Sequence, residues 1–239
     1  MARQLILDLG HRPASGRDDF LVGPSNAAAV EMIDQWPRWP AHAVLLLGPA
    51  GAGKSHLATV WQMRSGAHRI NLADLTVDSV PAAFSANALA LEDAEPDRVP
   101  ERAMFHLLNL ARQQGGHVLV TSRYPAAHWQ VKLPDLASRL KAIPEVAIAE
   151  PDDALLRGVL VKHFADRQIA VDEPMITYLL TRMPRSMAAA RELVGLIDAQ
   201  ALEEGVSVSR TLAGRVLQGY EGPGSAPRSG DMAEFTKTS

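Results

Sequence analysis

The sequence predicts an α/β protein: a three-layer sandwich around a parallel five-stranded sheet, followed by a small C-terminal helical lid. Three observations carry this prediction. Apolar runs typical of strands buried on both faces alternate with segments of helical spacing. A glycine-rich loop follows the first long run and precedes a helix. After Pro151 the apolar runs stop, and only helical patterns follow.

The elements follow in order along the chain. AHAVLLL (41–47) is the most continuous apolar run, HRINL (68–72) is a weaker one, and Glu92-Asp93 ends the run ANALAL. Gly115-Gly116 ends a helix whose apolar stripe begins at Met104. The expected strands cover 41–47, 68–72, 86–91, 117–122 and 145–149. The expected helices cover 24–36, 56–63, 101–114, 152–168, 173–183, 186–205 and 208–218.

Four segments are expected from this pattern. An extended arm covers 1–18, a nucleotide-binding domain 19–150 and a helical lid 151–218. Residues 219–239 are rich in Gly, Pro and Ser, and we expect them to be disordered.

Composition narrows the function classes. The 239 residues include no cysteine, which excludes disulfides and thiolate metal sites and fits a reducing compartment. The first apolar run is too short for a signal peptide, and no window approaches the ~20 apolar residues of a membrane helix. We therefore expect a cytoplasmic protein with no membrane partner. A net charge of −3 argues against bulk binding of nucleic acid.

The loop GPAGAGKSH fits G-x-x-x-x-G-K-[ST] at every fixed position, between a strand and a helix. Its glycines let backbone N–H groups face phosphate oxygens, and the following helix directs its positive end at the same anion. Lys54 is expected to reach the β- and γ-phosphates, and the Ser55 hydroxyl to ligate Mg²⁺. We call residues 48–55 the cradle. The expected nucleotide contacts are Gly48, Pro49, Ala50, Gly51, Ala52, Gly53, Lys54, Ser55 and His56.

Glu92 and Asp93 end the third strand. P-loop proteins place an acid that holds Mg²⁺ through water at the end of a neighbouring strand. Two assignments stay open. With Glu92 at the metal, Asp93 is the base, and its carboxylate lies about 1.5 Å short of where a glutamate would reach. With Asp93 at the metal, Ala94 stands where a base belongs. Both assignments predict slow intrinsic ATP turnover. In the first, a base misplaced by about 1 Å costs on the order of 100-fold in rate. In the second, the base is missing. An exposed acidic pair without function is the alternative.

Together these features resemble the AAA+ ATPases, and within them the DnaA branch. The cradle, the acidic strand end, VLVTSRYP (118–125), LPDLASRL (133–140) and a helical lid occur in that order, over roughly 19–215. The resemblance implies bound ADP or ATP with Mg²⁺. It places Val22, in FLVGPSN, at the adenine pocket and Thr121 at the γ-phosphate, although a β-branched strand residue is an equal alternative for Thr121.

The resemblance implies that LPDLASRL carries an arginine finger, which is Arg139 here. A finger that reaches ATP on another subunit raises its hydrolysis by ~10³ to 10⁵. In the DnaA-related regulators of replication initiation, that ATP is bound to DnaA. An ion-paired surface arginine is the alternative. The family also places a sensor arginine in the lid. The apolar period puts Ala188 at that position, with Arg185 nearly a turn before it and Arg191 nearly a turn after. Arg185 is the candidate sensor that contacts the nucleotide, and a lid that does not reach the γ-phosphate is the alternative.

The arm reads QLILDL, with three leucines on one face of an extended segment. Such a segment can add to a partner's surface, and the DnaA-related regulators carry a similar peptide that binds the sliding clamp, the β subunit of DNA polymerase III. Its expected contacts are Gln4, Leu5, Leu7 and Leu9, so DNA would be reached only through the clamp. An extra strand on the protein's own sheet is the alternative. The sequence leaves homo-oligomerisation open.

The function expected from the resemblance is regulation of replication initiation by stimulating hydrolysis of DnaA-bound ATP. An autonomous AAA+ ATPase that loads or remodels replication proteins is the second candidate. An initiator-type DNA binder is disfavoured by the net charge and by the short polar stretch after the lid.

Overall fold

The computed structural model describes residues 21–222 and confirms the predicted fold class. One sheet has the strand order β2-β3-β4-β1-β5, and every neighbouring pair is parallel. Its carboxyl ends therefore meet along one edge, where ligands bind in open α/β sheets. The strands are β1 (Ala43–Leu47), β2 (His68–Asn71), β3 (Ala88–Ala94), β4 (His117–Ser122) and β5 (Glu145–Ala147).

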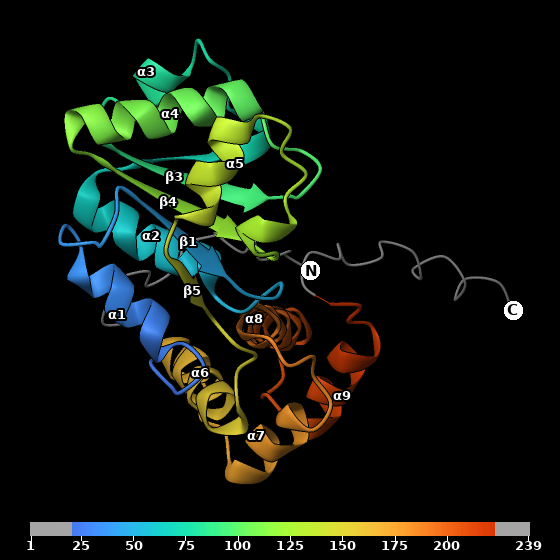
Figure 1. Cartoon of the computed structure of the whole chain (residues 1–239). Helices are drawn as coiled ribbons and strands as arrows, with labels where there is room; N and C mark the ends of the chain where they lie inside the picture. Colours follow the sequence, from blue (N-terminus) through green and yellow to red (C-terminus); the bar gives the residue numbers. More distant parts are fainter. Residues whose placement is uncertain (1–20, 223–239) are drawn as a thin grey trace, which may run out of the picture.

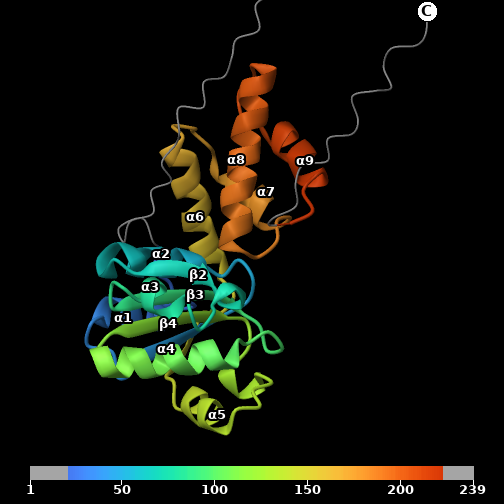
Figure 2. The same ribbon diagram turned by 90° about the horizontal axis from the view of Figure 1, so that it is seen from above.

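Helices cover both faces of the sheet, as Figures 1 and 2 show. Helices α1 and α2 pack on one face, and α3, α4 and α5 lie on the other. Alternation along the strands supplies both cores: Val44 and Ala90 face α2, whereas Leu45 and Leu89 face α4. The helices are α1 (Ala27–Gln35), α2 (Lys54–Ser65), α3 (Val80–Ala83), α4 (Glu101–Gln114) and α5 (Pro134–Lys141).

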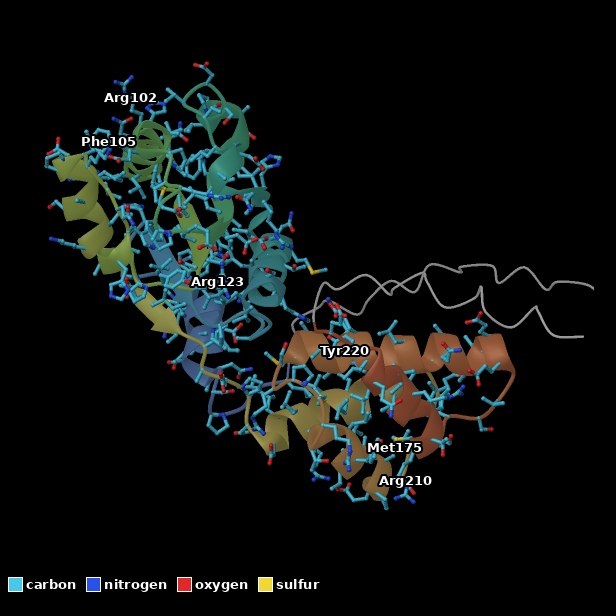
Figure 3. The ribbon with its side chains drawn as sticks, turned by 90° about the vertical axis from the view of Figure 1, so that its right-hand side faces the viewer. Arg102, Phe105, Arg123, Met175, Arg210 and Tyr220 are labelled. Carbon is cyan, nitrogen blue, oxygen red and sulfur yellow. The ribbon has the colours of Figure 1, made fainter. Side chains whose placement is uncertain are left out.

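The helical part follows β5 and has a buried core of its own. It packs beside the α/β part, as Figure 3 shows from the side. Aspartate or serine caps the start of each of its helices, accepting a hydrogen bond from a backbone N–H three residues on. The helices are α6 (Asp153–Asp166), α7 (Glu173–Leu180), α8 (Met187–Glu204) and α9 (Arg210–Gln218).

Several local features differ from the expected elements. Strand β3 continues through a bulge to Ala94, because Ala94 pairs with Ser122 beyond the irregularity. Helix α5 begins within LPDLASRL and ends at Lys141, and α3 forms where no element was expected. Both are short, so their apolar stripes give little periodic signal. Within residues 21–222, no helix combines the length and apolar character needed to cross a bilayer.

Candidate functional site

The cradle connects β1 to α2 at the carboxyl edge of the sheet. Gly51 and Gly53 have φ values of 74° and 106°, a region that favours glycine. Gly48 is needed for close approach, because a Cβ there would lie 2.8 Å from the Ile148 carbonyl oxygen. The loop thus turns tightly onto the N-terminus of a 12-residue helix, which is the geometry of an anion site.

Lys54 lies within this turn and is only 8% exposed. Its Nζ donates to the carbonyl oxygens of Gly48 and Pro49, at 2.7 and 2.9 Å. Burial lowers the pKa of the ammonium, and the Asp93 carboxylate acts in the opposite sense. Ser55 is exposed in the first turn of α2, and His56 beside it is half-buried. The loop therefore fits a nucleotide phosphate in its glycines, its lysine and its helix N-terminus.

The acids at the end of β3 are not equivalent. Glu92 pairs with Arg69 of β2, and Arg69 also donates to the Thr59 hydroxyl of α2. Asp93 has a φ of 54°, and its backbone N–H donates to Thr121 Oγ1 at 3.2 Å. Of the two acids, Asp93 is the one whose charge acts on Lys54, whereas Glu92 is paired with Arg69.

The end of β4 joins this bulge to the cradle. Thr121 and Ser122 are buried, and Ser122 Oγ lies 2.8 Å from the Ala94 carbonyl oxygen. On the other side, the Gly48 N–H donates to the Ser122 carbonyl oxygen at 3.2 Å. Thr121 therefore lies at the predicted edge, and its hydroxyl holds the backbone of Asp93.

The lid meets the cradle through the start of α8. Ser186 Oγ and the Ala188 N–H both contact the Gly51 carbonyl oxygen, at 3.3 and 3.4 Å. Arg185 is directed elsewhere, with hydrogen bonds to Asp153 at 2.6 Å and to the Pro151 carbonyl oxygen at 3.2 Å. The predicted sensor arginine is thus held at the start of α6, while small residues approach the cradle.

The segment before α1 links the lid to the sheet. The buried Asn26 side chain accepts from the Gly23 N–H and donates to the Leu21 carbonyl oxygen. Leu21 packs against the core of the helical part. Val22, between them, is 49% exposed. The contact of Val22 with an adenine base stays a prediction.

Arg139 lies on α5, on the opposite face of the sheet from α2 (Figure 2). Its guanidinium stacks over the Phe105 ring of α4, 5.0 Å from the centroid. The structure therefore places Arg139 and α2, the helix that begins at the chain's own cradle, on opposite faces of the sheet. The clamp-binding residues Gln4, Leu5, Leu7 and Leu9 lie outside the described residues.

Sequence reasoning missed three contacts around the cradle. These are the Arg69–Glu92 ion pair, an ion pair between Glu95 and Arg123, and the Ser186–Gly51 contact. Their only signal in the sequence was polar residues next to predicted sites. Among residues 21–222, no group of three or more His, Cys, Asp or Glu side chains is placed to hold a metal ion.

Comparison with known proteins places the fold. No protein-family model matches the sequence, and no curated protein matches it. Among solved structures, domain III of Thermotoga maritima DnaA aligns with a TM-score of 0.67 at 16% identity, over 86% of this chain and 96% of that chain. AMPPCP-bound DnaA from Aquifex aeolicus aligns with a TM-score of 0.63 at 19% identity, over 80% of this chain and 67% of that chain. A Thermotoga maritima RuvB mutant aligns with a TM-score of 0.66 at 14% identity, over 84% of this chain and 71% of that chain. The chain therefore has a DnaA-like AAA+ fold.

Proposed function

We propose that this chain is a DnaA-related regulator of replication initiation of the Hda type, in its alphaproteobacterial form. It binds ADP or ATP with Mg²⁺ in its own cradle. It docks on the sliding clamp through residues 4–9, and Arg139 stimulates hydrolysis of ATP bound to DnaA. The observation that carries the proposal is the position of Arg139, on the face of the sheet opposite α2. The similarity of the fold to domain III of DnaA supports DnaA as the partner.

Different cradle residues bind different parts of the nucleotide. The N–H groups at the start of α2 and the Lys54 ammonium bind phosphate oxygens, and Ser55 offers a hydroxyl to the metal. Bound there, the nucleotide and its Mg²⁺ supply a fixed anionic anchor between the sheet and the lid. Val22 contacts the base in this proposal. Crystallised DnaA binds AMPPCP, which supports a nucleotide on this fold.

Slow turnover by the chain itself is part of the proposal. Of the two assignments for the strand-end acids, the Arg69 ion pair favours Asp93 at the metal, because Glu92 would have to leave that arginine. Ala94 then follows Asp93, and its backbone is tied to Ser122. Of the two residues next to Asp93, Glu92 is held by Arg69 and Ala94 carries no carboxylate, so neither is placed as a general base. The nucleotide then mainly stabilises the domain.

Arg139 has the chemistry of a finger that acts on a neighbouring molecule. A guanidinium is always charged and matches the oxygens of a transferring phosphoryl group. Stacking on Phe105 limits its rotamers while leaving its edge available for hydrogen bonds. This orientation lowers the entropy lost when the side chain meets a phosphate.

The experiment mixes DnaA preloaded with γ-labelled ATP, clamp loaded on DNA, and this protein, and measures labelled phosphate. We expect strong stimulation by the wild type and loss of most of it with Arg139→Ala, a change on the order of 10³-fold. Lys141→Ala, on the same helix, is the matched control and keeps the stimulation. Stimulation retained by Arg139→Ala removes the finger assignment.

An autonomous ATPase that loads or remodels replication proteins is the second candidate. The similarity to RuvB, described as a Holliday junction branch migration motor, favours it. The two candidates differ in whose nucleotide is cleaved. Brisk release of phosphate from ATP by this protein alone would support the autonomous enzyme.

A further inference from the structure

An ion pair lies just beyond the ends of β3 and β4 and has no role in the function proposed above. Arg123 Nη2 lies 2.5 Å from Glu95 Oε1. The Glu95 side chain is 29% exposed and the Arg123 side chain 51%. An ion pair this exposed contributes little to stability, so the arginine can exchange partners at low cost.

The pair is adjacent to the cradle. Strand β4 lies between β1 and β3, and Ser122, the residue before Arg123, accepts the Gly48 N–H. Ser122 also holds Ala94, the residue before Glu95. One backbone hydrogen bond and one from the Ser122 hydroxyl therefore fix Arg123 and Glu95 at the same edge as the phosphate loop.

Besides the Arg69–Glu92 ion pair, Lys54, Arg123, Asp93 and Glu95 bring two further cations and two further anions to this edge. The charges of Asp93, Arg123 and Glu95 all act on the Lys54 ammonium. The carboxylates of Asp93 and Glu95 thus balance Lys54 and Arg123. Each phosphate group added beside Lys54 brings further negative charge, which competes with Glu95 for the guanidinium.

The lid brings small residues to the cradle. Ser186 and Ala188 contact Gly51, and Arg185 is bound to Asp153 and Pro151. Figure 3 shows Arg123 nearer the helical part than Arg102 and Phe105 are. Arg123 is therefore better placed than Arg185 to meet the end of a phosphate chain.

We infer that Arg123 is the residue that distinguishes a nucleoside triphosphate from a diphosphate, by moving from Glu95 to the terminal phosphate. The inference rests on the proposed nucleotide site and adds its specificity. A guanidinium suits the exchange, because its fork of donors matches carboxylate and phosphate oxygens alike. Glu95 then holds the arginine in place until a third phosphate is present.

The test is calorimetric titration of the full chain with ADP and with AMPPCP, each with Mg²⁺. We expect Arg123→Gln to weaken AMPPCP binding on the order of tenfold, the effect of a lost charged hydrogen bond, and ADP binding far less. Glu95→Gln releases the arginine and shifts the preference toward AMPPCP. Arg102→Gln, an exposed arginine on α4, is the matched control and changes neither affinity.

The outcomes separate this inference from the proposed function. Equal effects of Arg123→Gln on both ligands, or no effect, overturn the inference while the nucleotide site stands. Failure of the wild type to bind either ligand, or binding that Lys54→Ala leaves unchanged, overturns both. A preference for AMPPCP that falls with Arg123→Gln and rises with Glu95→Gln supports the inference.

Discussion

At the scale of single residues, the site depends on conformations that only certain side chains allow. Gly51 combines a left-handed φ with close contact to the lid, and Asp93 takes a left-handed φ at the bulge. These conformations bring the Gly51 carbonyl oxygen to Ser186 and the Asp93 N–H to the Thr121 hydroxyl. Small changes here are therefore expected to alter binding as well as stability.

Gly51→Ala should destabilise the protein and weaken ADP binding. The left-handed φ alone costs an alanine about 1–2 kcal/mol, and the new Cβ would also run into Ser186. Gly66→Ala is the matched control, because Gly66 has a φ of +69° but no atom within 4 Å of the added Cβ. Urea unfolding and ADP titration measure both variants. Equal losses of stability and unchanged ADP affinity would argue against a functional lid contact.

At the scale of elements, helix α8 links the lid to the cradle. Ser186 caps the helix by accepting the Ala189 N–H and also contacts the Gly51 carbonyl oxygen. These two residues are 135 positions apart in sequence. One serine thus connects a helix start to the phosphate loop.

Ser186→Ala should lower both stability and nucleotide affinity. Loss of the cap costs on the order of 1 kcal/mol, and loss of the Gly51 contact loosens the cradle. Ser209→Ala removes a comparable cap from α9, a helix that packs against α7 and α8. Chemical unfolding should show similar costs for the two variants, whereas only Ser186→Ala should weaken ADP binding. The reverse pattern is incompatible with this coupling.

At the scale of the whole molecule, the sheet and the cradle were predictable because their signals are local. Apolar runs indicate buried strands, and the GPAGAGKS spacing indicates a phosphate loop wherever it occurs between a strand and a helix. The bulge at Asp93 was not predictable, because it depends on Thr121 from the next strand. The partners of Glu92, Glu95 and Arg185 likewise come from distant segments that only the folded chain brings together.

The stability of the whole chain should fall in mild acid because of His163 on α6. Burial, followed by the charge of Arg167, lowers the pKa of this histidine from 6.5 to about 4. The unfolded chain therefore binds a proton near pH 6.5 that the folded chain resists until about pH 4. The resulting loss begins below pH 6.5 and is complete below about pH 4, at most on the order of 3 kcal/mol.

Urea unfolding of the wild type and His163→Gln between pH 7.5 and about 4 checks this expectation. The variant lacks the titrating group, so its stability should fall less over that interval. The difference in unfolding free energy between the two proteins should shift in favour of the variant as the pH falls. A difference that is constant with pH would show that His163 does not control acid stability.

The central claim is that Arg139 approaches the ATP of a neighbouring DnaA molecule. The sequence contains no cysteine, so Ser138→Cys, exposed on α5 beside Arg139, offers one attachment point for a photo-crosslinker. Met63→Cys, at a position 64% exposed on α2, is the control on the opposite face. In an assembly with clamp on DNA and DnaA–ATP, we predict crosslinks from position 138 to peptides of the DnaA nucleotide pocket, and few from position 63. Position 138 failing to crosslink there, while hydrolysis of DnaA-bound ATP is still stimulated, would contradict the claim.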